Sequence, residues 1–217
     1  MISKLSGRLN AFPSAALRNV LPWFNERRQF LSALIENPSA IGAIAPSSAA
    51  LARAITDTVR PGAGHVLELG CGTGVFTREI VRRGVWPREL VLVERDAGMS
   101  AALRDQFPRA TVLETPAQEL AADLAALPPI ATTICGLPLL NFDDADTFRI
   151  LTTVFDAMTD DGSLHLFTYG WRCPVSSLVL DACGLQARRR HFVPLNLPPA
   201  SVYVLERKAD TSRREAP

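Results

Sequence analysis

Several features that would assign a chain to a functional class are scarce or missing here. The 217 residues include four cysteines and three histidines. The cysteines form no CxxC pair and no metal-like cluster with the histidines, so we predict reduced thiols and no metal site. No apolar run reaches the roughly 18 residues that a membrane-spanning helix needs. The basic N-terminus has no continuous apolar core and no small-residue cleavage site, so we expect no secretory signal.

The sequence also lacks an excess of either charge. Its formal net charge is +1, which argues against a generally basic nucleic-acid-binding protein. With 47% hydrophobic and 21% charged residues, the composition is that of a folded globular chain. The length fits one sizeable domain. We therefore expect no nucleic-acid partner, and nothing in the sequence indicates an oligomeric state.

The chain divides into three zones. Residues 1–37 are basic and aromatic. Residues 38–208 alternate short apolar runs with helical patterns, which predicts a single α/β domain. Residues 209–217 are mostly polar and charged and predict a disordered tail.

Strand-like and helical segments alternate through the middle zone. Helical periodicity lies between strand-like runs at 65–69, 90–94, 110–113, 131–135 and 163–169. This alternation predicts βαβ units and a mostly parallel, doubly wound sheet with helices on both faces. Two final runs, 185–193 and 201–207, predict an antiparallel pair. Seven strands ending in a hairpin is the order of the Rossmann-like class I methyltransferase fold.

The stretch VLELGCGTG, residues 66–74, is the most specific motif in the chain. It joins a predicted strand to a predicted helix, which is where open α/β sheets bind ligands. Gly70, Gly72 and Gly74 allow a sharp turn and a close approach of the backbone to a ligand. The spacing differs from the dinucleotide fingerprint G-x-G-x-x-G, because the third Gly lies at 74 and position 75 is Val.

Two glutamates accompany this turn. Glu68 lies two residues before the first Gly and Glu94 follows the next strand. An acid beside the turn suits the cationic amino-acid end of S-adenosylmethionine (SAM), and Glu94 can accept hydrogen bonds from both ribose hydroxyls. We predict SAM as the cofactor, ahead of NAD or an ordinary Gly-rich loop. Position 116, where many SAM enzymes place an acid that contacts adenine, is Pro. We expect the backbone of Ala117 or Gln118 to hold the adenine instead.

The stretch TICGLPLLNF, residues 133–142, follows the fourth predicted strand, beside the expected position of the transferred methyl group. Many amino-methylating enzymes carry Asn-Pro-Pro-Tyr or Asn-Leu-Pro-Tyr there, whereas this chain has Gly136 and Leu139 in place of the Asn and Tyr. Without an aromatic ring, nothing in this turn stacks on a nucleic-acid base. We expect a small apolar opening for an aliphatic amine; a buried strand end without a role is the alternative.

Several stretches resemble the bacterial soluble-type phospholipid N-methyltransferases. They are GAIAPSSAALARAI, VLELGCGTGVFTREIVRRGV, LVLVERD, GLPLLN, FTYG and NLPPASVYVLER, which span about residues 30 to 207. GLPLLN and NLPPASVY are the most distinctive of them, whereas LGCGTG is shared by class I methyltransferases generally.

This resemblance implies up to three methylations of phosphatidylethanolamine, giving phosphatidylcholine. It also implies S-adenosylhomocysteine as a product and a cytoplasmic protein bound peripherally to the inner face of the cytoplasmic membrane. Some relatives act on ornithine lipids. The alternative enzymes are an rRNA adenine N6-dimethyltransferase and a methyltransferase of another lipid amine, such as ornithine lipid. A SAM-binding or membrane-associated module without turnover is the non-enzymatic alternative.

The predicted amine site consists of Tyr169, Leu137 and Pro138. An apolar site lowers the pKa of an amine and so favours its neutral, reactive form, and the Tyr169 ring could stabilise methylated cations by cation–π contact. Tyr203 and His165 are the alternatives to Tyr169. The predicted cofactor-binding residues are Ser47, Ser48, Glu68, Gly70, Cys71, Gly72, Thr73, Gly74, Glu94, Arg95, Ala117, Cys135 and Gly136.

Residues 14–36 have the pattern of a basic amphipathic helix. This pattern predicts contact between the N-terminal segment and an anionic membrane surface; a helix that packs on the sheet or covers the cofactor site is the alternative. The predicted membrane or substrate contacts are Arg18, Trp23, Phe24, Arg27, Arg28 and Tyr203. The basic run RRRH at 188–191 is either a phosphate-binding site or a solvated strand face.

Overall fold

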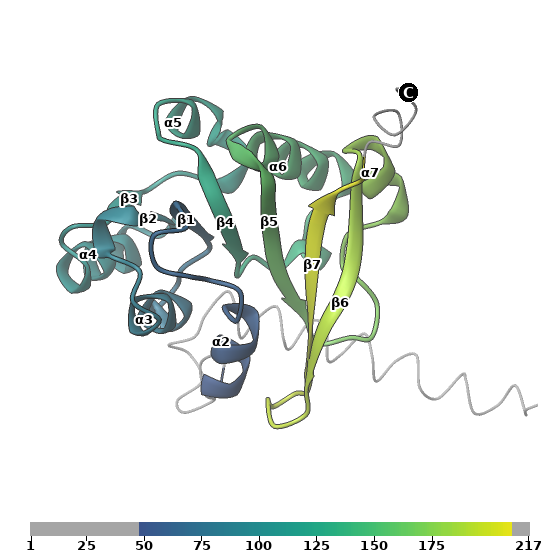
Figure 1. Cartoon of the computed structure of the whole chain (residues 1–217), viewed down its shortest axis with the longest axis horizontal. Coiled ribbons are helices and arrows are strands. Elements are labelled where there is room, and N and C mark those ends of the chain that lie inside the picture. Colours follow the sequence, from purple (N-terminus) through teal and green to yellow (C-terminus); the bar gives the residue numbers. More distant parts are fainter. Residues whose placement is uncertain (1–47, 210–217) are drawn as a thin grey trace, which may run out of the picture. The chain divides into compact units, whose positions relative to one another are not determined.

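A seven-stranded sheet forms the centre of the computed structural model, which describes residues 48–209 (Figure 1). The strand order is β3-β2-β1-β4-β5-β7-β6. Strands β1 to β5 are parallel, and β7 lies antiparallel between β5 and β6. The bounds are β1 His65–Leu69, β2 Leu90–Val93, β3 Thr111–Leu113, β4 Ile130–Cys135, β5 Met158–Thr168, β6 Leu185–Val193 and β7 Ala200–Arg207. The predicted class I methyltransferase fold is confirmed.

Helices cover both faces of this sheet (Figure 1). They are α2 Ala49–Ile55, α3 Val75–Arg82, α4 Ala97–Gln106, α5 Ala121–Ala125, α6 Asp144–Asp156 and α7 Ser177–Ala182. Helices α2, α3 and α4 share one hydrophobic core with the sheet, and α5, α6 and α7 share the other. Neighbouring residues of β2 supply both cores, with Leu92 in the first and Val93 in the second. This is the expected result of side chains that alternate along a strand buried on both faces.

Short polar side chains cap the first turns of four helices, α2, α4, α6 and α7. The side chain of Ser48 accepts a hydrogen bond from the Leu51 N–H at the start of α2. The side chain of Asp96 accepts one from the Met99 N–H at the start of α4. Asp143, which the sequence predicts as a cap, accepts from the Asp146 N–H at 2.7 Å. Each cap satisfies one of the free N–H groups in a first helical turn.

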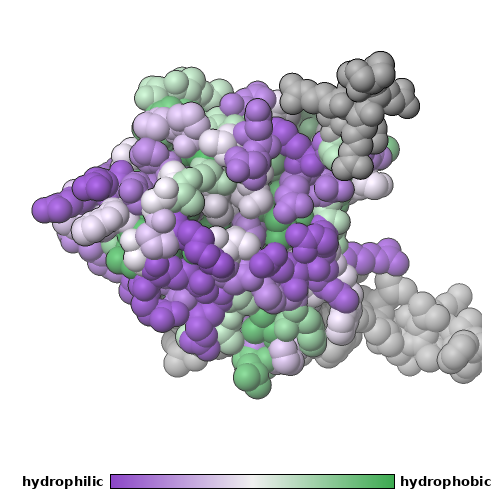
Figure 2. Space-filling model, in the orientation of Figure 1, coloured by the Kyte–Doolittle hydropathy of each residue, from purple (hydrophilic) through white to green (hydrophobic). Residues whose placement is uncertain are grey.

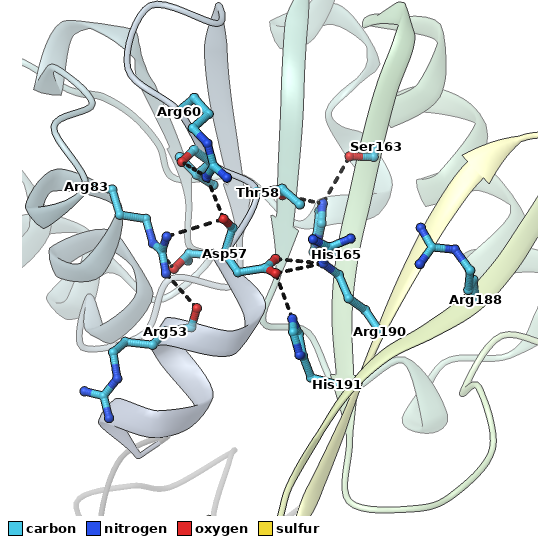
Figure 3. Close-up of polar contacts among 12 residues, drawn as sticks. Arg53, Asp57, Thr58, Arg60, Arg83, Ser163, His165, Arg188, Arg190 and His191 are labelled. Carbon is cyan, nitrogen blue, oxygen red and sulfur yellow. Dashed lines mark hydrogen bonds and ion pairs between the residues drawn. The ribbon is translucent and has the colours of Figure 1, made fainter.

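Helix α2 is fastened to the antiparallel part of the sheet at both ends. At its start, the Ser48 N–H donates to Asn196 Oδ1 at 3.0 Å. Just beyond its end, Asp57 accepts from Arg190 Nε and pairs with His191 Nε2, both at 2.8 Å (Figure 3). Burial raises the pKa of Asp57, but hydrogen bonds from His191 and Arg190 outweigh it and hold the pKa below its usual value. These contacts give half of the RRRH run a structural role that the sequence did not predict.

Several predictions fall on residues that the structure does not describe. The amphipathic helix predicted at 14–36, Ser47 and tail residues 210–217 lie outside the described range. So do the predicted membrane contacts Arg18, Trp23, Phe24, Arg27 and Arg28. Between Ser48 and Ala209, no helix has the length and apolarity needed to cross a membrane.

Candidate functional site

Four of the predicted site elements meet at one edge of the sheet. Gly70 follows β1, Glu94 follows β2, Gly136 follows β4 and Tyr169 follows β5. These four strands are parallel and adjacent in the sheet, so their carboxyl ends lie along the same edge (Figure 1). This edge is where open α/β sheets bind their ligands.

The glycine-rich turn crosses from β1 toward β2. The N–H groups of Gly70 and Cys71 both donate to the Val93 carbonyl, at 2.8 and 3.2 Å. Gly70 and Gly72 have φ angles of 69° and 53°, which L residues adopt only with strain. A Cβ atom added to Gly72 would meet nothing within 4 Å. The turn therefore has an open side on which a ligand can approach its backbone closely.

Glu94 is positioned against this turn by two backbone donors. Its Oε2 accepts from the Gly72 N–H at 2.8 Å and its Oε1 accepts from the Asp96 N–H at 3.0 Å. The side chain is half-buried. Because each carboxylate oxygen accepts more than one hydrogen bond, Glu94 keeps the capacity to bind the two ribose hydroxyls of SAM.

Glu68 is completely buried and only half satisfied. Its Oε2 accepts from Thr77 Oγ1 at 2.6 Å, whereas its Oε1 has no hydrogen-bond partner among the described residues. Burial raises the pKa of this carboxyl group to about 8, although the hydrogen bond from Thr77 opposes the rise. A buried unpaired acceptor is costly. A cationic ligand group such as the ammonium of SAM would offset that cost, so the residues present fit the cofactor.

The end of β4 packs directly on the glycine-rich turn. The Gly136 N–H donates to the Leu69 carbonyl at 2.8 Å. A Cβ atom on Gly136 would lie only 2.7 Å from the Gly70 oxygen, and one on Gly70 would lie 2.8 Å from Leu137 Cδ2. The sequence shows only that an Asn is missing at position 136. The structure gives the reason, because no side chain fits there unless the backbone moves.

Only part of the turn that the sequence predicts as an apolar opening is accessible. Leu139 is 3% exposed and packs in the core, so it does not line an opening. Leu137 and Pro138 are half-buried and Leu140 is 49% exposed. Cys135, at the end of β4, is buried, which raises the pKa of its thiol to about 12. The accessible part of the turn is therefore apolar and uncharged.

Tyr169 is tied to the same edge by aromatic contacts. Its ring meets Phe167 edge-to-face at 5.4 Å, and Phe167 meets Phe76 in the same manner at 5.8 Å. Phe76 lies in the first turn of α3, directly after the glycine-rich turn. Burial raises the pKa of Tyr169, so its hydroxyl stays neutral at ordinary pH. Its role as an amine contact remains a prediction.

The two alternatives to Tyr169 lie in the interior. His165 is fully buried, and its Nε2 lies 3.0 Å from Thr58 Oγ1 and 3.1 Å from Ser163 Oγ (Figure 3). Burial lowers the pKa of His165 to about 4. Tyr203 is 8% exposed and its hydroxyl donates to the Trp171 carbonyl. This burial does not support the predicted lipid contact of Tyr203, because its hydroxyl holds the segment after β5 instead.

The remaining predicted cofactor residues differ in their exposure. Cys71 is buried within the turn, and its Sγ lies 3.4 Å from the Glu68 carbonyl. Thr73 is exposed within the glycine-rich turn, and Arg95 is exposed directly after Glu94. Ala117 is buried in the 3-10 helix Ala117–Glu119, and Ser48 is occupied as the cap of α2.

Comparison with known proteins agrees with this geometry. Residues 66–162 match a family described as "Methyltransferase domain". An ornithine lipid N-methyltransferase from Singulisphaera acidiphila is 27% identical over 189 residues, which cover 80% of this chain and 92% of that protein.

Solved structures share the fold at low sequence identity. The 1,6-didemethyltoxoflavin-N1-methyltransferase of Burkholderia thailandensis, with bound S-adenosylhomocysteine, is 16% identical with a TM-score of 0.61, over 94% of this chain and 93% of its own. The magnesium protoporphyrin IX methyltransferase of Synechocystis, with bound SAM, is 13% identical with a TM-score of 0.52, over 70% and 73%. The ligands bound in these two structures are the cofactor and the product that the sequence of this chain predicts.

Replacing Glu94 by Gln removes one acceptor and the negative charge without changing size. We expect the dissociation constant for SAM to rise about tenfold or more, because hydrogen bonds to a charged group contribute about 1.5–3 kcal/mol. Isothermal titration calorimetry measures the change. Glu206→Gln is the matched control, because Glu206 is a half-buried glutamate of β7 that pairs with Arg188 away from the turn. Equal SAM affinity in both variants would show that Glu94 does not bind the cofactor.

Replacing Gly136 by Ala places a methyl group against the Gly70 oxygen. We expect the free energy of unfolding to fall by about 1–3 kcal/mol. We also expect weaker SAM binding, because the glycine-rich turn must move to make room for the methyl group. Gly170→Ala is the control, since its Cβ would lie 3.6 Å from the nearest atom. A Gly136→Ala protein with unchanged Tm and SAM affinity would show that the close approach is unimportant.

Replacing Glu68 by Gln removes a titration that opposes folding at high pH. The folded-state pKa of about 8 exceeds the ordinary value of 4.5. The folded state therefore holds a proton that the unfolded state releases, and wild-type stability falls between these pH values by up to about 1.4 kcal/mol per pH unit. We expect the Tm of Glu68→Gln minus that of wild type to be larger at pH 8.5 than at pH 5.5, without SAM. Thermal melts with the same difference at both pH values would contradict the raised pKa.

Proposed function

We propose that this protein is a class I SAM-dependent methyltransferase that methylates the amine of a membrane-lipid head group. The observation that carries the proposal is the uncharged turn Gly136–Leu140, which packs against the cofactor turn and offers apolar side chains without an aromatic ring. Similarity to an ornithine lipid N-methyltransferase along most of both chains supports it.

The chemistry of the turn suits an aliphatic amine. When bound, SAM supplies an electrophilic methyl group on a sulfonium. An ammonium has no lone pair to accept it, and a lipid amine resembles Lys in having a reference pKa well above 7. The apolar surroundings of Leu137 and Pro138 disfavour the charged form and lower that pKa. The neutral Tyr169 hydroxyl is our candidate for holding the amine, and its ring can stabilise methylated cations.

Two lipids are the candidate substrates. The sequence stretches that resemble phospholipid N-methyltransferases favour phosphatidylethanolamine, with successive methylations toward phosphatidylcholine. The curated relative favours an ornithine lipid. Both carry an aliphatic amine beside acyl chains, so the same apolar turn can receive either one. The absence of an aromatic residue from GLPLL argues against an rRNA adenine substrate, since a base has nothing there to stack on.

A lipid substrate also implies that the protein works at a membrane surface. We propose that it binds peripherally to the inner face of the cytoplasmic membrane, with residues 14–36 in contact with anionic lipid. The basic and aromatic pattern of that segment supports this assignment.

A labelled-methyl assay separates the candidates. Purified full-length protein and methyl-tritiated SAM are incubated with anionic vesicles that contain phosphatidylethanolamine, with the same vesicles containing ornithine lipid, and with total RNA. We expect label in one lipid pool, resolved by thin-layer chromatography into its methylated forms, and at least tenfold less with Glu94→Gln at limiting SAM. Label in RNA alone, or in neither lipid at saturating SAM, would overturn the proposal.

A further inference from the structure

The loop between β6 and β7 carries the two most exposed large apolar side chains among the described residues. Leu195 is 86% exposed and Leu197 is 84% exposed. In Figure 2 the lower tip of the described surface, where Figure 1 shows this loop, is hydrophobic below a broad hydrophilic area. Single exposed leucines are common, but two on one short loop form a feature that needs an explanation.

The residue between the two leucines holds them outward. Asn196 is 4% exposed, its Oδ1 accepts from the Ser48 N–H at 3.0 Å, and its Nδ2 donates to the Pro198 carbonyl at 2.8 Å. The loop is therefore pinned to the start of α2 by its middle residue. The outward direction of both leucines follows from this anchored geometry.

An aromatic pair with an arginine stands at the base of the same loop. Trp171 is 67% exposed and stacks on Phe192, which is 44% exposed, with ring centroids 4.7 Å apart. The Arg189 guanidinium lies 5.5 Å from the centre of the Trp171 ring. The buried Tyr203 hydroxyl fixes the Trp171 backbone. This set of side chains suits the interfacial zone of a bilayer. Exposed leucines enter the boundary of the acyl chains, whereas aromatic rings and arginine lie at the level of the head groups.

The loop also lies at the edge of the sheet where the chemistry occurs. Ser201, near the start of β7, pairs with Thr168 at the end of β5, next to Tyr169. A lipid whose head group reaches the Gly136–Leu140 turn keeps its acyl chains in the bilayer, so this edge must face the membrane.

We propose that the β6–β7 loop inserts Leu195 and Leu197 into an anionic membrane surface, with Trp171, Phe192 and Arg189 at the head-group level. This inference rests on the proposed function for its orientation. It differs from the contact proposed for residues 14–36 because it assigns membrane binding to the folded domain itself.

Vesicle partitioning of the full-length protein tests the loop directly. Sucrose-loaded vesicles of phosphatidylcholine and phosphatidylglycerol contain no amine substrate, so binding is measured without turnover. We expect the double variant Leu195→Ser/Leu197→Ser to partition about tenfold less than wild type, because two apolar side chains no longer enter the interface. Leu178→Ser, a 75% exposed leucine of α7 at the opposite edge of the sheet (Figure 1), is the matched control and should bind as wild type does.

Three outcomes would overturn the inference. They are unchanged partitioning of the double variant, an equal loss with Leu178→Ser, and a change in oligomeric state by light scattering, which would assign the loop to a second copy of the chain. Thermal melts confirm that the variants are folded.

A monomeric substrate separates this inference from the proposed function. With short-chain phosphatidylethanolamine or ornithine lipid below its micelle concentration, the double variant should keep wild-type kcat/KM within twofold, while methylation of vesicle lipid falls about as far as partitioning does. Equal losses on both substrate forms would contradict a membrane role. If neither lipid is methylated by any protein, the proposed function fails, and the partitioning result still decides whether the loop binds membranes.

Discussion

The close contact between two backbone segments at the carboxyl edge of the sheet is the constraint on which the rest of the site depends. Gly136 donates to the Leu69 carbonyl and leaves no room for a side chain beside the Gly70 oxygen. The cofactor turn and the apolar turn after β4 are thus held together by main-chain atoms. Because a misplacement of about 1 Å between donor and acceptor can slow a reaction a hundredfold, a backbone contact that fixes the two turns relative to each other suits methyl transfer.

The two glutamates that we predict to bind the cofactor have opposite environments. Glu94 is half-buried and already oriented by the N–H groups of Gly72 and Asp96. Glu68 is buried, with one oxygen unpaired and a pKa raised to about 8. Glu94 is therefore ready to accept hydroxyl donors, whereas Glu68 gains from a cation. A ligand with ribose hydroxyls at one end and an ammonium at the other satisfies both, which explains why SAM suits the pair better than a pyrophosphate would.

The parts of the fold that depend on local pattern could be predicted from the sequence, and the parts that depend on distant contacts could not. Strand alternation and the glycine spacing predicted β1 and the turn after it, because both signals lie within a few residues. The reason for Gly136 depends on the Gly70 oxygen across the sheet edge. The burial of Tyr203 depends on the place of β7 between β5 and β6. The pairing of Asp57 with Arg190 likewise joins α2 to β6 and leaves no local signal.

One hydrogen bond holds the start of α2 against the β6–β7 loop that we assign to the membrane. The Ser48 N–H donates to Asn196, the residue between the exposed leucines, so the chain enters α2 beside the β6–β7 loop. Residues 14–36 precede this point by a short covalent connection. Two weak membrane contacts on one chain, separated by a short linker, act at a high effective concentration, so the two proposed contacts would together bind more tightly than either alone. The bonds of Asp57 to β6 hold the other end of α2. Ser48, at the start of α2, is therefore fixed relative to the carboxyl edge of the sheet.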